Sequence, residues 1–195
     1  MLGFFVQLSD SLKARYLCLQ ILTGVFKKRK SVSHILESQR VSVSFYKDSD
    51  VAIAKRLSDF IFLHLNSVDY CIDLYVKKNI KLEVRNILRL VIAEYVNKGS
   101  PDYAIVNSAV KLAKLNKVSS FFSGLVNAIA RKLVLNLRKN ELVFKPELQA
   151  NFRINLRKYY TEDVIQKLEK LITKRAPIDI TISDKKDINF FRKQL

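Results

Sequence analysis

Apolar residues recur at spacings of three and four along most of this chain, which is the periodicity of an amphipathic helix. Only 4 glycines and 3 prolines interrupt the pattern in 195 residues, so few tight turns are available. This scarcity argues against a sandwich, a barrel or a glycine-rich phosphate loop. Because 49% of the residues are hydrophobic, the chain has enough apolar surface to bury a core. The sequence therefore predicts an all-α protein.

The chain divides into two regions of different character. Residues 1–140 are expected to form a helical bundle, and residues 141–195 a short connector that begins a small α/β unit. In the connector, helices are expected from Pro146 and after the N-cap Thr161, and the alternating PIDITI at 177–182 predicts a strand. A loop is expected at 41–50. The helices expected in the bundle are 11–26, 31–37, 50–65, 68–78, 82–96, 101–117 (with Pro101 as first residue) and 119–138.

Charge gives the first indication of function. The formal net charge is +17, and two windows, 11–36 and 103–140, contain no acidic residue. Clustered cations of this kind are typical of proteins that bind the phosphate backbone of nucleic acids. A basic surface that only keeps the protein soluble remains an alternative. An anionic membrane surface is less favoured, because no helix joins a basic face to an exposed aromatic one.

The candidate RNA contacts come from both acid-free windows. The cations at the start of the first helix lie where backbone N–H groups attract phosphate. The cations at 27–30 form a dense KKRK patch. Replacing them with neutral residues is expected to flatten the salt dependence of RNA binding. The sequence shows no segment that combines aromatic and basic residues into a stacking surface, so recognition of phosphates and of RNA shape is expected more than base readout. The predicted RNA-binding residues are Lys13, Arg15, Lys27, Lys28, Arg29, Lys30, Arg131, Lys132, Arg138 and Lys139.

No catalytic or metal-binding motif is present in the sequence. It has no G-x-G-x-x-G, no P-loop and no G-x-S-x-G. His34 and His64 are expected on different helices, and Cys18 and Cys71 lie in apolar helical patterns where buried thiols are expected. The apolar N-terminal run is too short to span a bilayer and lacks a cleavage site, so a cytoplasmic location is expected.

Three segments resemble NusB-like domains. KARYLCLQILTGVF resembles the first helix of these domains, and SPDYAIVNSAVKLAK followed by SGLVNAIARKL resembles the last two. The second of those helices usually reads G-x-V-N-A-x-L-R, and Ala130 stands here where leucine is common. The resemblance implies an all-α RNA-binding domain. The residues that match the pattern are Gly124, Val126, Asn127, Ala128 and Arg131.

The continuation beyond this domain resembles a particular family. The stretch 145–182 is similar to the connector of the RsmB (Sun/Fmu) family of 16S rRNA cytosine-C5 methyltransferases, in which a NusB-like domain precedes the catalytic domain. The resemblance implies a non-catalytic, rRNA-binding front part. The domain that binds S-adenosylmethionine lies outside the resemblance, so no cofactor is expected in this chain. RNA and a methyltransferase domain are the implied partners.

Two other functions remain open from the sequence. The NusB-like domain also occurs as a free transcription antitermination factor, which binds RNA together with a ribosomal protein. A degenerate fragment without activity is the other alternative. Binding to structured rRNA and to a boxA-type single strand would discriminate between the three.

Overall fold

The computed structural model describes residues 8–40, 45–76, 79–97, 100–139, 144, 147–172, 174 and 181. These residues form helices and connecting turns, with no strand among them, so the all-α prediction is confirmed. The predicted strand at 177–182 lies outside the described residues, apart from Thr181. The helices are α1 (Asp10–Lys28), α2 (Val32–Arg40), α3 (Asp48–Leu63), α4 (Leu65–Asp73), α5 (Leu82–Val96), α6 (Asp102–Leu115), α7 (Lys117–Ser120), α8 (Ser123–Arg138), α9 (Ala150–Leu156) and α10 (Glu162–Leu171).

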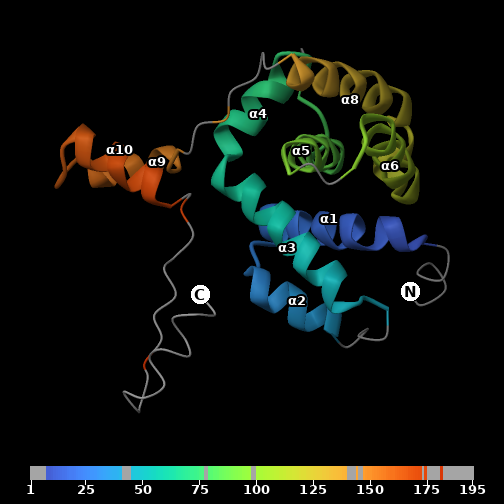
Figure 1. Ribbon diagram of the computed structural model, residues 1–195, viewed down its shortest axis with the longest axis horizontal. Helices are drawn as coiled ribbons and strands as arrows, with labels where there is room; N and C mark the ends of the chain where they lie inside the picture. Colours follow the sequence, from blue (N-terminus) through green and yellow to red (C-terminus); the bar gives the residue numbers. More distant parts are fainter. Residues whose placement is uncertain are drawn as a thin grey trace, which may run out of the picture.

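The bundle is built around α5. Figure 1 shows α5 end-on, with α1, α4, α6 and α8 around it. The sequence of this helix explains its position, because ten of its residues are buried and apolar side chains occupy more than one of its faces. Val91 and Ile92 join the apolar cluster shared with α4, α6 and α8, while Leu90 and Ala93 join the cluster shared with α1 and α3.

A buried polar contact fixes α5 against α1 and α4. Arg89 is 5% exposed and donates two hydrogen bonds of 2.7 Å to the carboxylate of Asp69 on α4. Its guanidinium also lies 4.4 Å from the ring centre of Phe26 on α1. Because a buried charge without partners is unfavourable, this geometry holds the three helices in one arrangement.

The first helix approaches α2 closely at Gly24. A Cβ atom added there would lie 2.7 Å from Cγ1 of Ile35, closer than real contacts allow. Farther along α1, Leu17 and Ile21 are fully or almost fully buried in the cluster that includes Ile61 of α3. Close packing on both α2 and α3 therefore fixes the position of α1.

Several helix boundaries differ from those predicted. The helix expected at 119–138 is divided at Phe121–Phe122 into α7 and α8. Helix α7 begins at Lys117, because the Asn116 side chain caps it by accepting a 2.8 Å hydrogen bond from the Val118 N–H. Pro101 is the N-cap of α6 rather than its first residue. The loop expected at 41–50 ends before Asp48, because α3 begins at that residue.

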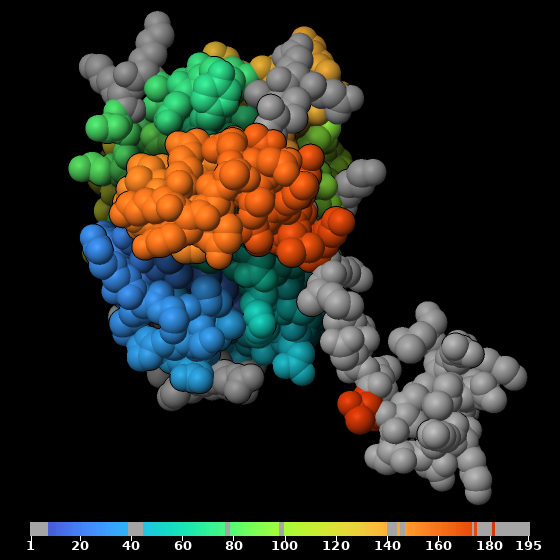
Figure 2. Space-filling model, turned by 90° about the vertical axis from the view of Figure 1, so that its left-hand side faces the viewer, coloured from blue at the N-terminus to red at the C-terminus, as the bar shows by residue number. Residues whose placement is uncertain are grey.

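The last two helices form a pair beside the bundle. Figure 1 shows α9 and α10 on the side opposite α6, and Figure 2, viewed from that side, shows them in front of the bundle. Arg153 of α9 joins them by ion pairs to Glu162 and to Glu169, the latter at 3.3 Å. The predicted helix start at Pro146 lies outside the described residues, and α9 begins at Ala150.

Candidate nucleic-acid interface

The two cations predicted at the start of α1 have partners within the protein. Arg15 forms an ion pair with Glu94 of α5 and donates a 2.8 Å hydrogen bond to Ser100 Oγ. Lys13 pairs with Asp10 at 2.9 Å, and its Nζ lies 4.8 Å from the ring centre of Phe45. The side chains of Lys13 and Arg15 are 17% and 13% exposed. The structure thus turns Arg15 toward the core rather than toward a ligand.

Glu94 explains why Arg15 is held inside. Burial raises the pKa of the Glu94 carboxyl, while the hydrogen bond and charge of Arg15 act in the opposite direction. Glu94 lies 79 positions from Arg15 in the sequence, so only the packing of α1 on α5 brings the two together.

The KKRK patch closes α1 and is partly occupied by intramolecular contacts. Lys27 pairs with Glu83 of α5 at 2.8 Å, and this hydrogen bond lowers the pKa of the Glu83 carboxyl. Lys30 Nζ lies 3.0 Å from Nε2 of His34. Arg29 ends the helix with a φ of 52°, in the left-handed region. All four cations are exposed, and Lys28 and Arg29 present their charge to solvent.

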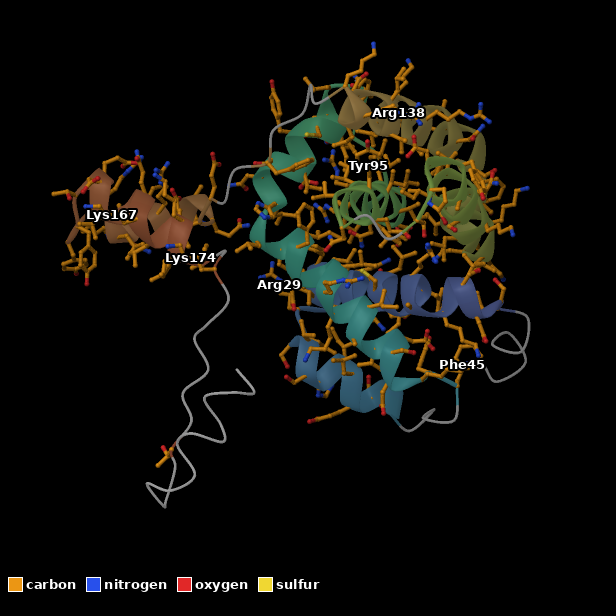
Figure 3. The ribbon with its side chains drawn as sticks, in the orientation of Figure 1. Arg29, Phe45, Tyr95, Arg138, Lys167 and Lys174 are labelled. Carbon is orange, nitrogen blue, oxygen red and sulfur yellow. The ribbon has the colours of Figure 1, made fainter. Side chains whose placement is uncertain are left out.

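The remaining predicted cations lie elsewhere on the molecule. Arg131, Lys132, Arg138 and Lys139 are exposed on or just after α8, and Arg138 pairs with Asp102 at the start of α6. Figure 3 shows Arg29 and Arg138 on separate parts of the bundle. The ten predicted residues therefore lie in three places, at the start of α1, at its end and on or just after α8, rather than on one continuous surface.

An open groove follows the contact between α6 and α8. Its larger part has a volume of about 580 Å³, its smaller part about 310 Å³, and both parts share Asn107 and Arg131. We call this the α6–α8 groove. Its polar and aromatic lining residues are Asp102, Tyr103, Asn107, Lys111, Lys114, Ser123, Asn127, Arg131 and Arg138, with Gly124 beside them.

The spacing of these residues explains how they line one groove. On α6, Asn107, Lys111 and Lys114 follow at intervals of four and three, which places them on one face of the helix. On α8, Ser123, Asn127 and Arg131 follow at intervals of four. The two helices are antiparallel, because Arg138 at the end of α8 pairs with Asp102 at the start of α6, while Lys114 near the end of α6 lines the groove with Ser123 at the start of α8.

The groove is strongly cationic. Within the described part of the chain, no carboxylate pairs with Lys111, Lys114 or Arg131, and Arg131 is oriented by a 3.3 Å hydrogen bond to Asn127 Oδ1. Asp102 is its one acidic lining residue among those described, and Arg138 neutralises it. Three uncompensated positive charges thus face the groove.

The NusB family profile matches residues 12–134, which include most of α1, all of α2 to α7 and most of α8. The chain belongs to the NusB family. No curated protein sequence and no solved structure matches the chain significantly. The NusB domain is a non-catalytic domain, and domains of this family bind RNA.

The NusB domain includes three groove residues that the sequence did not place in the candidate site. Lys111, Lys114 and the aromatic Tyr103 line the groove but were not among the predicted RNA contacts. Both lysines lie in the acid-free window 103–140, and their spacing from Asn107 indicates that the three residues share one helix face. What the sequence lacked was the identity of the helix against which that face packs.

The remaining reactive groups of the NusB domain do not form a site. Cys18 and Cys71 are free and buried, as predicted, and burial raises the pKa of each thiol. Among the described residues, no three His, Cys, Asp or Glu side chains are grouped as a metal site requires. No described helix is both long and apolar enough to cross a membrane.

Proposed function

We propose that this chain binds RNA through the α6–α8 groove. The observation that carries the proposal is the set of three cations, Lys111, Lys114 and Arg131, that face the groove without a carboxylate partner in the described part of the chain. Neutralising phosphates with such residues releases condensed counterions, which supplies most of the sequence-independent binding energy.

The start of α8 adds to the attraction for phosphate. Ser123 and Gly124 line the groove at the positive end of the helix dipole, where the first backbone N–H groups have no partner within the helix. A Cβ at Gly124 would meet no atom within 4 Å, and its φ is not positive, so neither packing nor backbone geometry requires glycine there. The missing side chain leaves the backbone open to a ligand.

The finer proposal is an rRNA-binding, non-catalytic part of a 16S rRNA cytosine-C5 methyltransferase-like protein. Residues 1–140 would be its RNA-binding domain and 141–195 its connector. The pair α9–α10 supports this context, because it follows the family match and lies opposite α6, so a domain attached there would leave the groove open. S-adenosylmethionine would belong to that other domain, and this chain would hold no cofactor.

The second candidate is an antitermination factor that acts with a ribosomal protein. Phe121 favours it, because this side chain is 89% exposed two positions before Ser123, which lines the groove, and an unpaired strand offers bases to such a ring. The two candidates share the RNA-binding surface and differ in the target.

The test is binding of the purified chain to a 16S rRNA fragment and to a boxA-type single strand, at about 50 mM and about 200 mM salt. We expect affinity to fall steeply with salt for the preferred RNA. Preference for the rRNA fragment supports the methyltransferase context, and preference for the single strand supports antitermination. Salt-insensitive or absent binding to both would contradict RNA binding and favour a degenerate fragment.

A further inference from the structure

Another open pocket lies on the bundle, away from the α6–α8 groove. It is formed by one face of α3, by His64 between α3 and α4, by Asn97 at the end of α5 and by Lys174 after α10. Its volume is about 770 Å³, and it shares no lining residue with the α6–α8 groove. Figure 3 shows Lys174 beside the bundle, on the side of α9 and α10, and well away from Arg138. We call this the α3–α5 pocket.

The sequence of α3 explains how its side chains reach this pocket. Ala52, Lys55, Asp59 and Leu63 follow at intervals of three and four, which places them on one face of the helix, and Arg56 lies beside them. At the end of α5, the Asn97 amide is held by a 2.8 Å hydrogen bond to the Ala93 carbonyl. After α10, the Lys174 N–H bonds to the Leu171 carbonyl at 3.0 Å. Three elements far apart in the sequence therefore meet at one pocket.

The pocket is cationic. Lys55, Arg56 and Lys174 line it, all three are exposed, and no carboxylate of the described residues lies within ion-pair distance of any of them. Asp59 is the single acidic residue in the described lining, so positive charge exceeds negative. Lysine and arginine together are suited to a phosphate group, because its oxygens accept several charge-assisted hydrogen bonds.

The wall of the pocket adds an apolar surface and a buried polar atom. Phe60 and Leu63 line it, and the His64 ring packs on Phe60 with 4.7 Å between ring centres. Nδ1 of His64 is buried and has no hydrogen-bond partner among the described residues. A buried polar atom without a partner is unfavourable, so this atom favours a ligand that brings a hydrogen-bonding group of its own.

We propose that the α3–α5 pocket binds a small organic phosphate of about the size of a mononucleotide. Its phosphate would lie on the three cations, and its ring-shaped body against Phe60 and Leu63. Pockets that bind small molecules have volumes of about 300 to 1,000 Å³ and combine apolar walls with a few polar groups, as this one does. This inference goes beyond the proposed function and does not depend on it, because no residue of the α6–α8 groove takes part.

The experiment measures the binding of three probes to the full chain by calorimetry. The probes are AMP, adenosine, which lacks the phosphate, and inorganic phosphate, which lacks the ring. Arg56→Gln and Lys174→Gln each remove one cation, from opposite ends of the sequence of the pocket. Ala52→Leu adds bulk at an exposed position of the wall without changing the charge. Lys158→Gln is the matched control, since Lys158 is an exposed cation that does not line the pocket.

We expect AMP to bind about tenfold or more tightly than either adenosine or inorganic phosphate, because AMP alone uses both the cations and the apolar wall. Arg56→Gln and Lys174→Gln should each weaken AMP binding about tenfold, as expected for the loss of a charge-assisted hydrogen bond. Ala52→Leu should weaken AMP binding and leave its salt dependence unchanged. Lys158→Gln should have no effect.

Three results would contradict the proposal. The first is that AMP does not bind. The second is that inorganic phosphate binds as tightly as AMP and that Ala52→Leu has no effect, since the cations would then be an ordinary charged surface. The third is that Arg56→Gln and Lys174→Gln weaken RNA binding but not AMP binding, which would assign these cations to RNA.

One further variant keeps this inference separate from the proposed function. Arg131→Gln, in the α6–α8 groove, should weaken RNA binding and leave AMP binding unchanged. If the chain binds AMP but no RNA, the proposed function fails and the α3–α5 pocket stands. If it binds RNA but not AMP, the proposed function stands and the inference about the pocket is wrong.

Discussion

At the scale of single residues, Arg15 shows how a distant carboxylate decides the role of a cation. The sequence places Arg15 at a helix start, where it would attract phosphate, but the ion pair with Glu94 gives it a place in the core. The side chains of Arg15 and Glu94 are 13% and 5% exposed, so removing either partner leaves the other buried without compensation. We therefore expect Arg15 to contribute to the stability of the fold rather than to RNA affinity.

Arg15→Gln is expected to lower the free energy of unfolding by about 3 kcal/mol at neutral pH. Because burial raises the pKa of Glu94, the folded state holds more protons than the unfolded state above the ordinary value of 4.5. The free energy of unfolding contributed by Glu94 therefore falls as the pH rises from 4.5 through the raised pKa of Glu94, and the total fall is larger in the variant, where Arg15 no longer lowers that pKa. Urea unfolding at several pH values measures this. A variant of unchanged stability and weakened RNA binding would contradict the structural role.

Arg29 carries an unfavourable backbone conformation for a residue with a side chain. Its φ of 52° allows the chain to leave α1, and the Lys30 N–H bonds to the Gly24 carbonyl at 3.1 Å. Arg29→Gly is expected to stabilise the protein by about 0.5 to 1 kcal/mol, because glycine adopts this conformation without strain. Arg29→Ala removes the same charge but keeps the strain, so it serves as the control in thermal unfolding. Equal stability of the two variants would argue against the strain.

At the scale of elements, the apolar periodicity predicted most of the helices. It could not show the break between α7 and α8, because the apolar pattern runs on through Phe121 and Phe122 and the break depends on polar contacts. The Ser119 hydroxyl bonds to a residue six positions away, across the end of α6. These contacts form in the turn that follows α6, so the helical spacing of apolar residues does not predict them.

The candidate site could be predicted in composition but not in arrangement. The acid-free windows identified segments rich in cations, and α8 does carry its predicted cations at the surface. The pairing of Arg15 with Glu94 and of Lys27 with Glu83 depends on how α1 packs on α5. The groove likewise exists only because α6 and α8 are antiparallel neighbours, which charge counts along the chain do not show.

Ser119→Ala is expected to destabilise the protein by about 1 to 2 kcal/mol, because the Ala113 carbonyl loses a buried donor. Ser120→Ala is the matched control, since the Ser120 hydroxyl bonds at 3.0 Å to Lys117 in an exposed position. Chemical denaturation of both variants measures the difference. If the two substitutions have the same small effect, the Ser119 hydrogen bond does not hold the turn between α7 and α8.

At the scale of the whole molecule, the described helices fall into a bundle and a separate pair. The apolar clusters of the bundle draw on α1 to α6 and α8, and Phe144 adds to them by packing at 5.8 Å between ring centres on Phe60. In α9 and α10, Ile165 and Glu169 are the buried residues. Most of the packing energy therefore belongs to the bundle.

A chain that ends after Glu147 is expected to unfold cooperatively, with a free energy within about 1 kcal/mol of that of the full chain. This cut keeps Phe144 on Phe60 and removes α9 and α10. Parallel urea titrations of both chains give the comparison. A shortened chain that fails to fold would show that the pair belongs to the same cooperative unit, and the proposed division near residue 140 would be wrong.

The central claim is that the α6–α8 groove is the RNA-binding surface. The most direct measurement is the salt dependence of RNA affinity for a variant with Lys111, Lys114 and Arg131 replaced by glutamine. The control replaces three exposed cations outside the groove, namely Lys55, Arg56 and Lys158, so the net charge of the two variants is equal. We predict that the groove variant loses about two units of the log–log slope, at roughly 0.7 per phosphate contact, while the control keeps the wild-type slope. Equal slopes for the groove variant and the wild type would contradict the claim.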